Sequence, residues 1–148
     1  MMRGYINREE QTRDMLWTSP EGLVFYRSGD MGRVDEEGFV YILDRRKDMI
    51  ISGGFNIYAV DLEKVLLAHP AVADVAVIAI PSEQWGETPL GLVVLKPGCT
   101  EDEAEILEWT NGQLGKAQRL TAIEFRPELP RSTIGKVLKR DLRAPYWP

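Results

Sequence analysis

The sequence predicts an α+β fold in which helices pack on a small sheet. Three apolar runs, residues 72–80, 90–95 and 120–125, have the length and composition of strands. Residues 59–69 and 101–114 have the apolar spacing or the capping residues of helices. The 148 residues, 44% of them hydrophobic, suffice for one domain with a core, or for one domain and part of another.

The N-terminal part is expected to form one short helix and two stretches of strand. Asn7 followed by Glu10 has the spacing of a capping box, which predicts a helix ending near Leu16. A short strand is expected at residues 23–26. Residues 33–43 should fold back as a hairpin, because an acidic, glycine-containing segment separates its two halves.

Five consecutive charged residues, 44–48, then interrupt the hydrophobic pattern. Taken alone, such a run is typical of a solvated linker. The chain next reaches Ser52, Gly53 and Gly54, where the missing Cβ atoms permit a tight turn and close backbone approach to a ligand. A plain glycine turn without a ligand is the alternative interpretation.

The helix predicted from Ala59 ends before Pro70, because the residue before a proline avoids the helical conformation. His69, the single histidine, is expected to be a helix-end residue and not a metal ligand. Cys99 is also alone and can form neither an internal disulfide nor a cysteine cluster. A lone cysteine suits a reducing cytoplasm.

Residues 72–80 are apolar almost throughout, which predicts a central strand covered on both faces. The next strand is expected to begin after Pro89. Thr100 followed by Glu103 has the spacing of a capping box and predicts the start of the helix over residues 101–114.

The local charge reverses sign near the C-terminal end, although the whole chain carries a net charge of −5. Gly135 lets the backbone approach a ligand, and Lys136 brings a compact charge suited to phosphate or carboxylate oxygens. A P-loop is excluded, because Pro130 and Val137 stand where that motif needs glycine and a hydroxyl residue. The segment is therefore a candidate small-anion site, or else the solvated basic start of a helix over residues 137–143. Its basic residues are Arg131, Lys136, Lys139, Arg140 and Arg143.

Composition excludes several classes of protein. The acidic balance, with a pI near 5.0, argues against non-specific nucleic-acid binding. No apolar run reaches the roughly 20 residues of a membrane span, and no segment has the pattern of a signal peptide. We therefore expect a cytoplasmic protein without a nucleic-acid partner.

Several motifs resemble, in the same order, those of the adenylate-forming enzymes, the superfamily of acyl-CoA synthetases, luciferases and adenylation domains. Residues 129–136 resemble Leu-Pro-Lys/Arg-Ser/Thr-x-x-Gly-Lys. Residues 26–30 resemble Tyr-Arg-Thr-Gly-Asp, and residues 44–57 resemble Gly-Arg-x-Asp/Lys-Asp-x-Ile-x-x-Gly-Gly-x-Asn-Ile. Residues 85–87, Trp-Gly-Glu, also resemble a family segment, so the resemblance covers essentially residues 4–140.

The resemblance implies the small C-terminal domain of these enzymes, preceded by a β-hairpin and a remnant of the large domain. Residues 1–44 are then the tail of the large N-terminal domain, residues 45–47 the hinge and residues 48–148 the small domain. The family's phosphate loop and acyl pocket are not found in this sequence. The chain is therefore expected to be part of a longer enzyme and inactive by itself.

The resemblance assigns roles to single side chains. Lys136 takes the position of the catalytic lysine, which bridges the carboxylate and the α-phosphate during adenylation. Asp30 takes that of the ribose ligand, since one carboxylate offers two acceptors to two hydroxyls, although an ordinary turn aspartate is the alternative. Arg45 would add a forked donor to ribose or phosphate. Asp44 departs from the commoner glycine of the pattern, as in some branches of the family.

Lys47 falls at the hinge about which the small domain rotates between the two half-reactions. Rotation would withdraw Lys136 and bring Gly53 and Gly54 to the pantetheine tunnel, where glycine leaves room for a thiol. Residues 58–63 lack the proline usual in this segment, which affects the helix start and the hinge geometry but removes no chemical group.

The implied reaction activates a carboxylic acid with ATP to an acyl-adenylate and transfers the acyl group to CoA. ATP, CoA and Mg²⁺ are the implied cofactors, with the carboxylic acid as substrate. Two alternatives remain: part of an adenylation domain that loads a carrier protein, or a non-catalytic binding module of the same fold.

Apolar side chains in residues 1–44 would pack against the rest of the large domain. Without it, we expect self-association through this N-terminal tail, because exposed apolar area favours a second copy.

Overall fold

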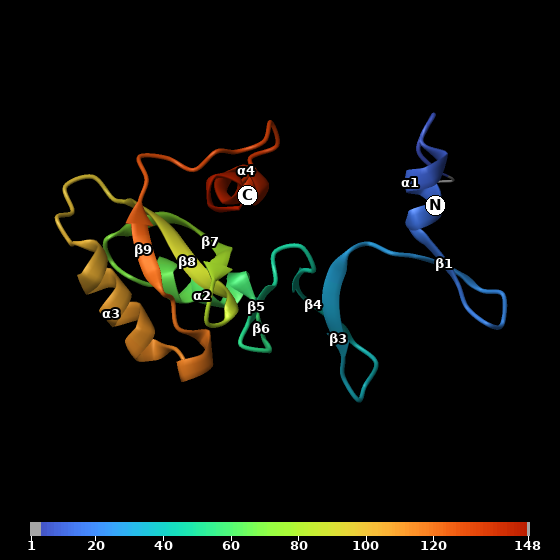
Figure 1. Cartoon of the computed structure of the whole chain (residues 1–148), viewed down its shortest axis with the longest axis horizontal. Coiled ribbons are helices and arrows are strands. Elements are labelled where there is room, and N and C mark those ends of the chain that lie inside the picture. The colour runs from blue at the N-terminus through green and yellow to red at the C-terminus, as the bar shows by residue number, and fades with distance from the viewer. Residues whose placement is uncertain (1–3, 148) are drawn as a thin grey trace.

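The computed structural model describes residues 4–147. Its N-terminal part contains helix α1 and two separate antiparallel ribbons, β1 with β2 and β3 with β4. Figure 1 shows these ribbons extending away from the rest of the chain. Their bounds are α1 (Glu9–Asp14), β1 (Leu16–Thr18), β2 (Val24–Tyr26), β3 (Asp30–Val34) and β4 (Val40–Arg45).

A five-stranded sheet forms the centre of the second part. The strand order is β6-β5-β8-β7, and β9 pairs in parallel with β8, whereas all other pairs are antiparallel. The central strand is therefore β8. The bounds are β5 (Ile50–Ser52), β6 (Phe55–Ile57), β7 (Val72–Ser82), β8 (Gly86–Leu95) and β9 (Ala122–Phe125).

Helices and loops cover both faces of this sheet. One core joins the sheet to α2 (Ala59–Leu67) and α3 (Glu103–Gln113) through residues such as Leu62, Leu66 and Ile106. The core of the other face contains Leu129 and the partly buried Leu142. On that face lie α4 (Lys139–Arg143) and the 3₁₀ turn η2 (Ala144–Tyr146), while η1 (Lys116–Gln118) precedes β9. These two layers on a sheet confirm the predicted α+β class.

Hydrogen bonds from Tyr146 and Trp147 attach the C-terminal segment to the sheet. Tyr146 donates to Glu124 Oε2 at 2.6 Å, and Arg126 Nη2 donates to the same oxygen at 2.7 Å. Burial, together with the bond to Glu124, raises the pKa of Tyr146 above its ordinary value. Trp147 Nε1 donates to the carbonyl of Ala79 on β7 at 3.0 Å.

Strand β7 is covered on both faces, as predicted, but it lies at an edge of the sheet and not at its centre. The prediction failed because apolar composition reports burial, whereas strand order depends on pairing with distant segments. Strand β8 also begins earlier than predicted and includes Pro89. The carbonyl of Pro89 faces Thr121, so its nitrogen points to the side where β9 has not yet begun and no ladder bond is lost.

Both predicted capping boxes were wrong in position. Asn7 has a φ of +56°, the N-cap of α1 is Arg8, and no side chain caps that helix. The box of α3 joins Asp102 and Glu105, whose side chains each accept the other's backbone N–H, at 2.8 and 3.0 Å. An alternative acceptor two residues further on thus displaced the predicted pair.

The other predicted elements are present with shifted ends. The terminal helix begins at Lys139 instead of residue 137, and the sequence did not predict β1, β5 or β6. In the part of the chain that the structure describes, no helix is long and apolar enough to cross a bilayer.

Candidate functional site

The β3–β4 hairpin places Asp30 directly opposite Arg45. Arg45 Nε lies 3.2 Å from Asp30 Oδ1, and the two side chains are 61% and 29% exposed. A carboxylate that can accept from hydroxyls and a guanidinium that can donate to oxyanions therefore stand side by side. The sequence predicted both residues but not that they form one pair.

The turn of this hairpin is closed by Asp35. Its Oδ1 accepts from the backbone N–H groups of Phe39 at 2.9 Å and Glu37 at 3.0 Å. The bond from Phe39 is the main reason why the pKa of Asp35 lies below its ordinary value. The turn thus sets the register next to it, and the shift of one residue between Met31 and Gly32 then brings Asp30 opposite Arg45.

Lys47 lies exposed in the turn after β4. Its carbonyl accepts from Arg143 Nη1 of α4 at 2.6 Å, and Arg143 Nη2 lies 3.5 Å from Asp48 Oδ1. On the other side of the turn, Asp44 Oδ2 accepts from Val60 N in the first turn of α2 at 3.4 Å. The residue that replaces the pattern's glycine therefore contacts a helix start that has no side-chain cap of its own.

Gly53 and Gly54 form the turn between β5 and β6, with φ of +55° and +84°. The amide of Gly53 donates to the carbonyl of Trp85 at 2.9 Å. A Cβ at residue 53 would lie 2.8 Å from Cε3 of Trp85, so the tryptophan excludes any side chain there. Both the sign of φ and the close contact explain why residue 53 is glycine.

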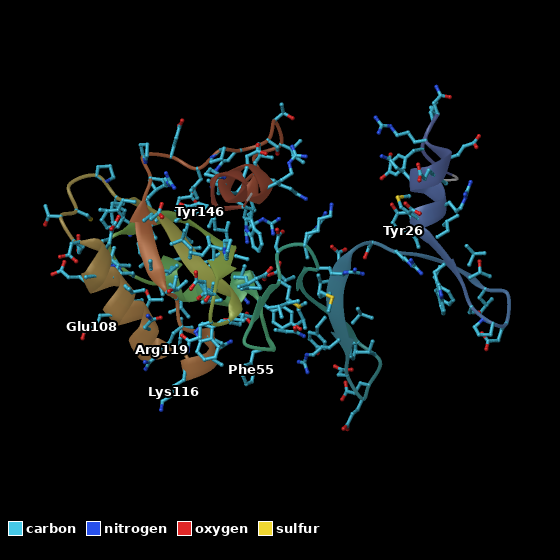
Figure 2. All side chains as sticks on the ribbon, in the orientation of Figure 1. Tyr26, Phe55, Glu108, Lys116, Arg119 and Tyr146 are labelled. Atoms are coloured by element: carbon cyan, nitrogen blue, oxygen red, sulfur yellow. The ribbon has the colours of Figure 1, made fainter. Side chains whose placement is uncertain are left out.

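A cavity of about 500 Å³ lies beside this glycine turn. Lys116 and Arg119 bring two exposed cations to it, and Phe55 and Trp85 bring aromatic rings. Figure 2 shows Lys116, Arg119 and Phe55 on the same side of the molecule. Sequence reasoning missed both cations, and the signal that could have found them is the pair of basic residues between α3 and β9.

Lys136 ends a short loop that is closed by backbone hydrogen bonds. Ser132 N donates to the carbonyl of Lys136, and Leu138 N to that of Pro130, each at 2.8 Å. Gly135 turns the chain with a φ of +80°. Lys136 is exposed, and its ammonium has no hydrogen-bond or ion-pair partner within residues 4–147. The loop therefore presents a free cation on an ordered backbone.

The ends of this loop are fixed to the sheet. Leu129 is 6% exposed and belongs to the core beneath α4. Lys139 Nζ lies 2.7 Å from Glu63 Oε1, and the amide of Val77 donates to the same oxygen at 2.8 Å. Both side chains of that ion pair are less than one-fifth exposed.

The structure brings some predicted residues together and leaves others apart. Asp30 contacts Arg45, and the glycine turn shares a cavity with Trp85. Within residues 4–147, no hydrogen bond or ion pair joins Lys136 to Asp30 or Arg45. His69 lies just after α2, where its Nδ1 accepts from Ala71 N, and it packs edge-on against Trp109.

Comparison with known proteins identifies the family. A sequence model of the AMP-binding enzyme C-terminal domain matches residues 61–136. The chain belongs to this family. The motifs around Asp30, Arg45 and Lys136 resemble those of the adenylate-forming enzymes, in agreement with this match.

Two CoA ligases are among the curated proteins similar to this chain. The chain is 44% identical over 140 residues to 2-succinylbenzoate–CoA ligase of Bacillus cereus, a match that covers 95% of the chain and 28% of the relative. It is 42% identical over 142 residues to long-chain-fatty-acid–CoA ligase of Bacillus subtilis, which covers 96% of the chain and 24% of that enzyme. The chain thus spans about a quarter of the length of these relatives.

Solved structures of ligases are also similar to this chain. ATP-bound MatB from Rhodopseudomonas palustris is 40% identical and matches 97% of this chain and 28% of its own, with a TM-score of 0.84. The o-succinylbenzoate CoA synthetase MenE of Bacillus subtilis with its acyl-adenylate is 36% identical and matches 96% of this chain and 28% of its own, with a TM-score of 0.81. Apo MatB, at the same identity and coverage as the ATP-bound form, has a TM-score of 0.68. The arrangement of this chain is therefore closer to the ATP-bound form of MatB than to its apo form.

Proposed function

We propose that the chain is the C-terminal part of an AMP-forming acyl-CoA ligase. The observation that carries this proposal is the free Lys136 ammonium on a loop whose backbone is already closed. Adenylation joins two anions, a carboxylate and the α-phosphate of ATP, and a preorganised cation stabilises the charge that develops between them. The CoA ligases among the relatives support this reaction class.

Asp30 and Arg45 are proposed to bind the nucleotide. Each is the other's ion-pair partner at 3.2 Å, which keeps both side chains on one face of the hairpin. The Asp30 carboxylate can then accept from the two ribose hydroxyls, while the Arg45 fork donates to ribose or phosphate oxygens. ATP supplies the adenylyl group and the leaving pyrophosphate.

Lys47 is proposed as the hinge between residues 1–44 and residues 48–148. Arg143 holds the Lys47 carbonyl to the small domain, so rotation would occur on the N-terminal side of that peptide group. The Asp44 contact to Val60 crosses the proposed hinge and would belong to one orientation of the two parts. The higher TM-score with ATP-bound MatB supports the adenylation orientation for this one.

CoA is proposed as the acyl acceptor, with the cavity beside Gly53 as the place for its nucleotide end. The phosphates of CoA fit the two cations Lys116 and Arg119, and its adenine fits the rings of Phe55 and Trp85. The missing side chain of Gly53 leaves room at the cavity edge for the pantetheine arm.

Mg²⁺ is proposed only as an ion that arrives with the phosphates of ATP. Within residues 4–147, no group of three or more histidine, cysteine or acidic side chains could hold a metal.

The test joins this chain to the N-terminal part of the Bacillus cereus 2-succinylbenzoate–CoA ligase, in place of that enzyme's matching segment. ATP–pyrophosphate exchange with 2-succinylbenzoate reports adenylation, and the truncated ligase without this chain is the control. We expect exchange above that control and formation of the CoA thioester. Exchange without thioester formation would instead favour a carrier protein as acceptor, and a folded chimera without exchange would contradict the proposal.

A further inference from the structure

Arg131, five residues before Lys136, has a fixed place in the lysine loop. Its Nη1 donates to the carbonyl of Gly135 at 2.7 Å, and its Nη2 donates to Asp74 Oδ2 on β7. The two acceptors lie far apart in the chain: Gly135 is on the loop, and Asp74, 57 positions before Arg131, is on the sheet. The planar guanidinium therefore joins the loop to the sheet by two separate bonds.

Both polar groups of the Gly135–Lys136 peptide are held by side chains of the same loop. Arg131 binds the Gly135 carbonyl, and Ser132 Oγ accepts from the Lys136 N–H at 3.2 Å. Gly135 has no Cβ and a φ of +80°. A glycine can adopt many backbone conformations, so the residue itself does little to fix the orientation of this peptide. The side-chain bonds consequently fix the direction in which the Lys136 side chain leaves the backbone.

Asp74 is a rigid anchor for the guanidinium. The register of β7 against β8 shifts between Val72 and Asp74, and such a bulge re-aims the side chain beside it. Asp74 Oδ1 also accepts from the amide of Val75 at 3.0 Å, and Val75 itself is buried. The carboxylate is thus held by the sheet and not by the loop that it restrains.

The Asp74–Arg131 pair has a larger effect on geometry than on stability. The two side chains are 33% and 44% exposed, and ion pairs at such positions add little to the free energy of folding. The loop keeps its attachment through buried Leu129 and its closure through the Leu138-to-Pro130 backbone bond. Removing the pair should therefore leave the fold intact and free the Gly135–Lys136 peptide.

We propose that Arg131 and Asp74 are positioning residues that aim the ammonium of Lys136. This role deepens and rests on the proposed function of Lys136, and neither side chain is required to touch a substrate. Displacement of a reacting group by about 1 Å can cost on the order of 100-fold in rate, so a loosened peptide is expected to lower kcat. An Arg131 that bound ATP directly would instead raise KM for ATP.

The first measurement uses the whole chain without any partner. We expect the backbone ¹⁵N order parameter at Lys136 to fall from the roughly 0.85 of rigid backbone to below about 0.6 in Arg131→Ala and in Asp74→Asn. Order parameters in β8 should stay unchanged, and Lys64→Ala, which breaks the exposed ion pair with Asp61, serves as the control. An unchanged order parameter at Lys136 in both variants would overturn the proposal.

The second measurement uses the chimeric ligase. We expect Arg131→Ala and Asp74→Asn each to lower kcat for ATP–pyrophosphate exchange by about 10- to 100-fold at unchanged KM for ATP. The double variant should be no slower than either single variant, since the two residues act as one unit. Arg131→Lys should recover part of the rate, because an ammonium keeps the charge but cannot bond both acceptors in the fixed fork geometry. A rise in KM alone, or losses that multiply in the double variant, would contradict the positioning role.

Failure of the two proposals can be told apart. If Lys136→Ala retains full exchange in the chimera, the catalytic role of Lys136 is wrong. The order parameters at Lys136 then test separately whether Arg131 and Asp74 fix the loop. If Lys136→Ala abolishes exchange while Arg131→Ala and Asp74→Asn change neither readout, only the positioning role is wrong.

Discussion

Lys116 and Arg119 line the cavity beside Gly53, together with the ring of Trp85. If they bind the phosphates of CoA, each charge-assisted contact contributes on the order of 1.5–3 kcal/mol, or about a tenfold change in affinity or more. Replacing either by alanine in the chimeric ligase should raise KM for CoA by about tenfold and leave ATP–pyrophosphate exchange unchanged. The KM increase should shrink at high salt, because phosphate contacts are screened.

The control for this pair is Lys64→Ala, on the exposed side of α2. Equal losses in exchange and in thioester formation would show that Lys116 and Arg119 support the fold of the small domain instead of binding CoA.

Sequence motifs predicted part of the candidate site. The other residues were missed because their partners lie far away in the chain. Asp30, Arg45 and Lys136 stand in contiguous patterns, so the sequence alone could single them out. The partner of Arg131 is Asp74, 57 positions earlier, and only the pairing of β7 with β8 brings that carboxylate to the loop. The cations Lys116 and Arg119 were missed for the same reason, since the glycine turn that they face comes more than 60 positions before them.

At the scale of elements, the proposed hinge turn can be tested with proline. Proline fixes φ near −65° and removes the N–H of residue 47, from which no hydrogen bond is made within residues 4–147. Lys47→Pro in the chimera should therefore restrict rotation at residue 47. We expect adenylation to continue and thioester formation to fall sharply, as followed by exchange and by CoA consumption. Full turnover would exclude a hinge at Lys47.

The β3–β4 hairpin should depend on pH through Asp35. Its pKa is lowered in the folded chain, so the stabilisation is present above the ordinary pKa and is lost as pH falls through the lowered value. An NMR titration should give a pKa for Asp35 below that of an unstructured aspartate, and Asp35→Asn should remove this part of the pH dependence of the hairpin amide shifts. A pKa at or above the ordinary value would contradict the role of the turn.

Element positions followed from apolar runs and spacing, whereas strand order and helix caps did not. Residues 72–80 were correctly predicted to be buried on both faces, but the edge position of β7 follows from β8 pairing with β9 and β5 on its other side. The cap of α3 lies at Asp102 and not at Thr100, because both residues are suitable N-caps and local spacing cannot rank them.

At the scale of the whole molecule, the N-terminal ribbons expose a large apolar area. Trp17, Leu23, Val24 and Phe25 are each 45–60% exposed, and Figure 1 shows their ribbon separated from the sheet domain. Burying one such side chain fully is worth roughly 1.5–3 kcal/mol, which favours pairing with a second copy. We predict that the chain self-associates through residues 1–44, whereas a shortened chain starting at Asp48 stays monomeric in sedimentation velocity. A monomeric full chain, or a shortened chain that associates equally, would disprove this.

We propose that Lys136 serves adenylation alone and is withdrawn for thioester formation. The most direct measurement compares the two half-reactions of the chimeric ligase with and without Lys136→Ala. We expect ATP–pyrophosphate exchange to fall on the order of 10²- to 10³-fold, the usual effect of removing one preorganised donor, while transfer from supplied acyl-adenylate to CoA largely survives. An equal fall in both half-reactions would instead make Lys136 a structural residue.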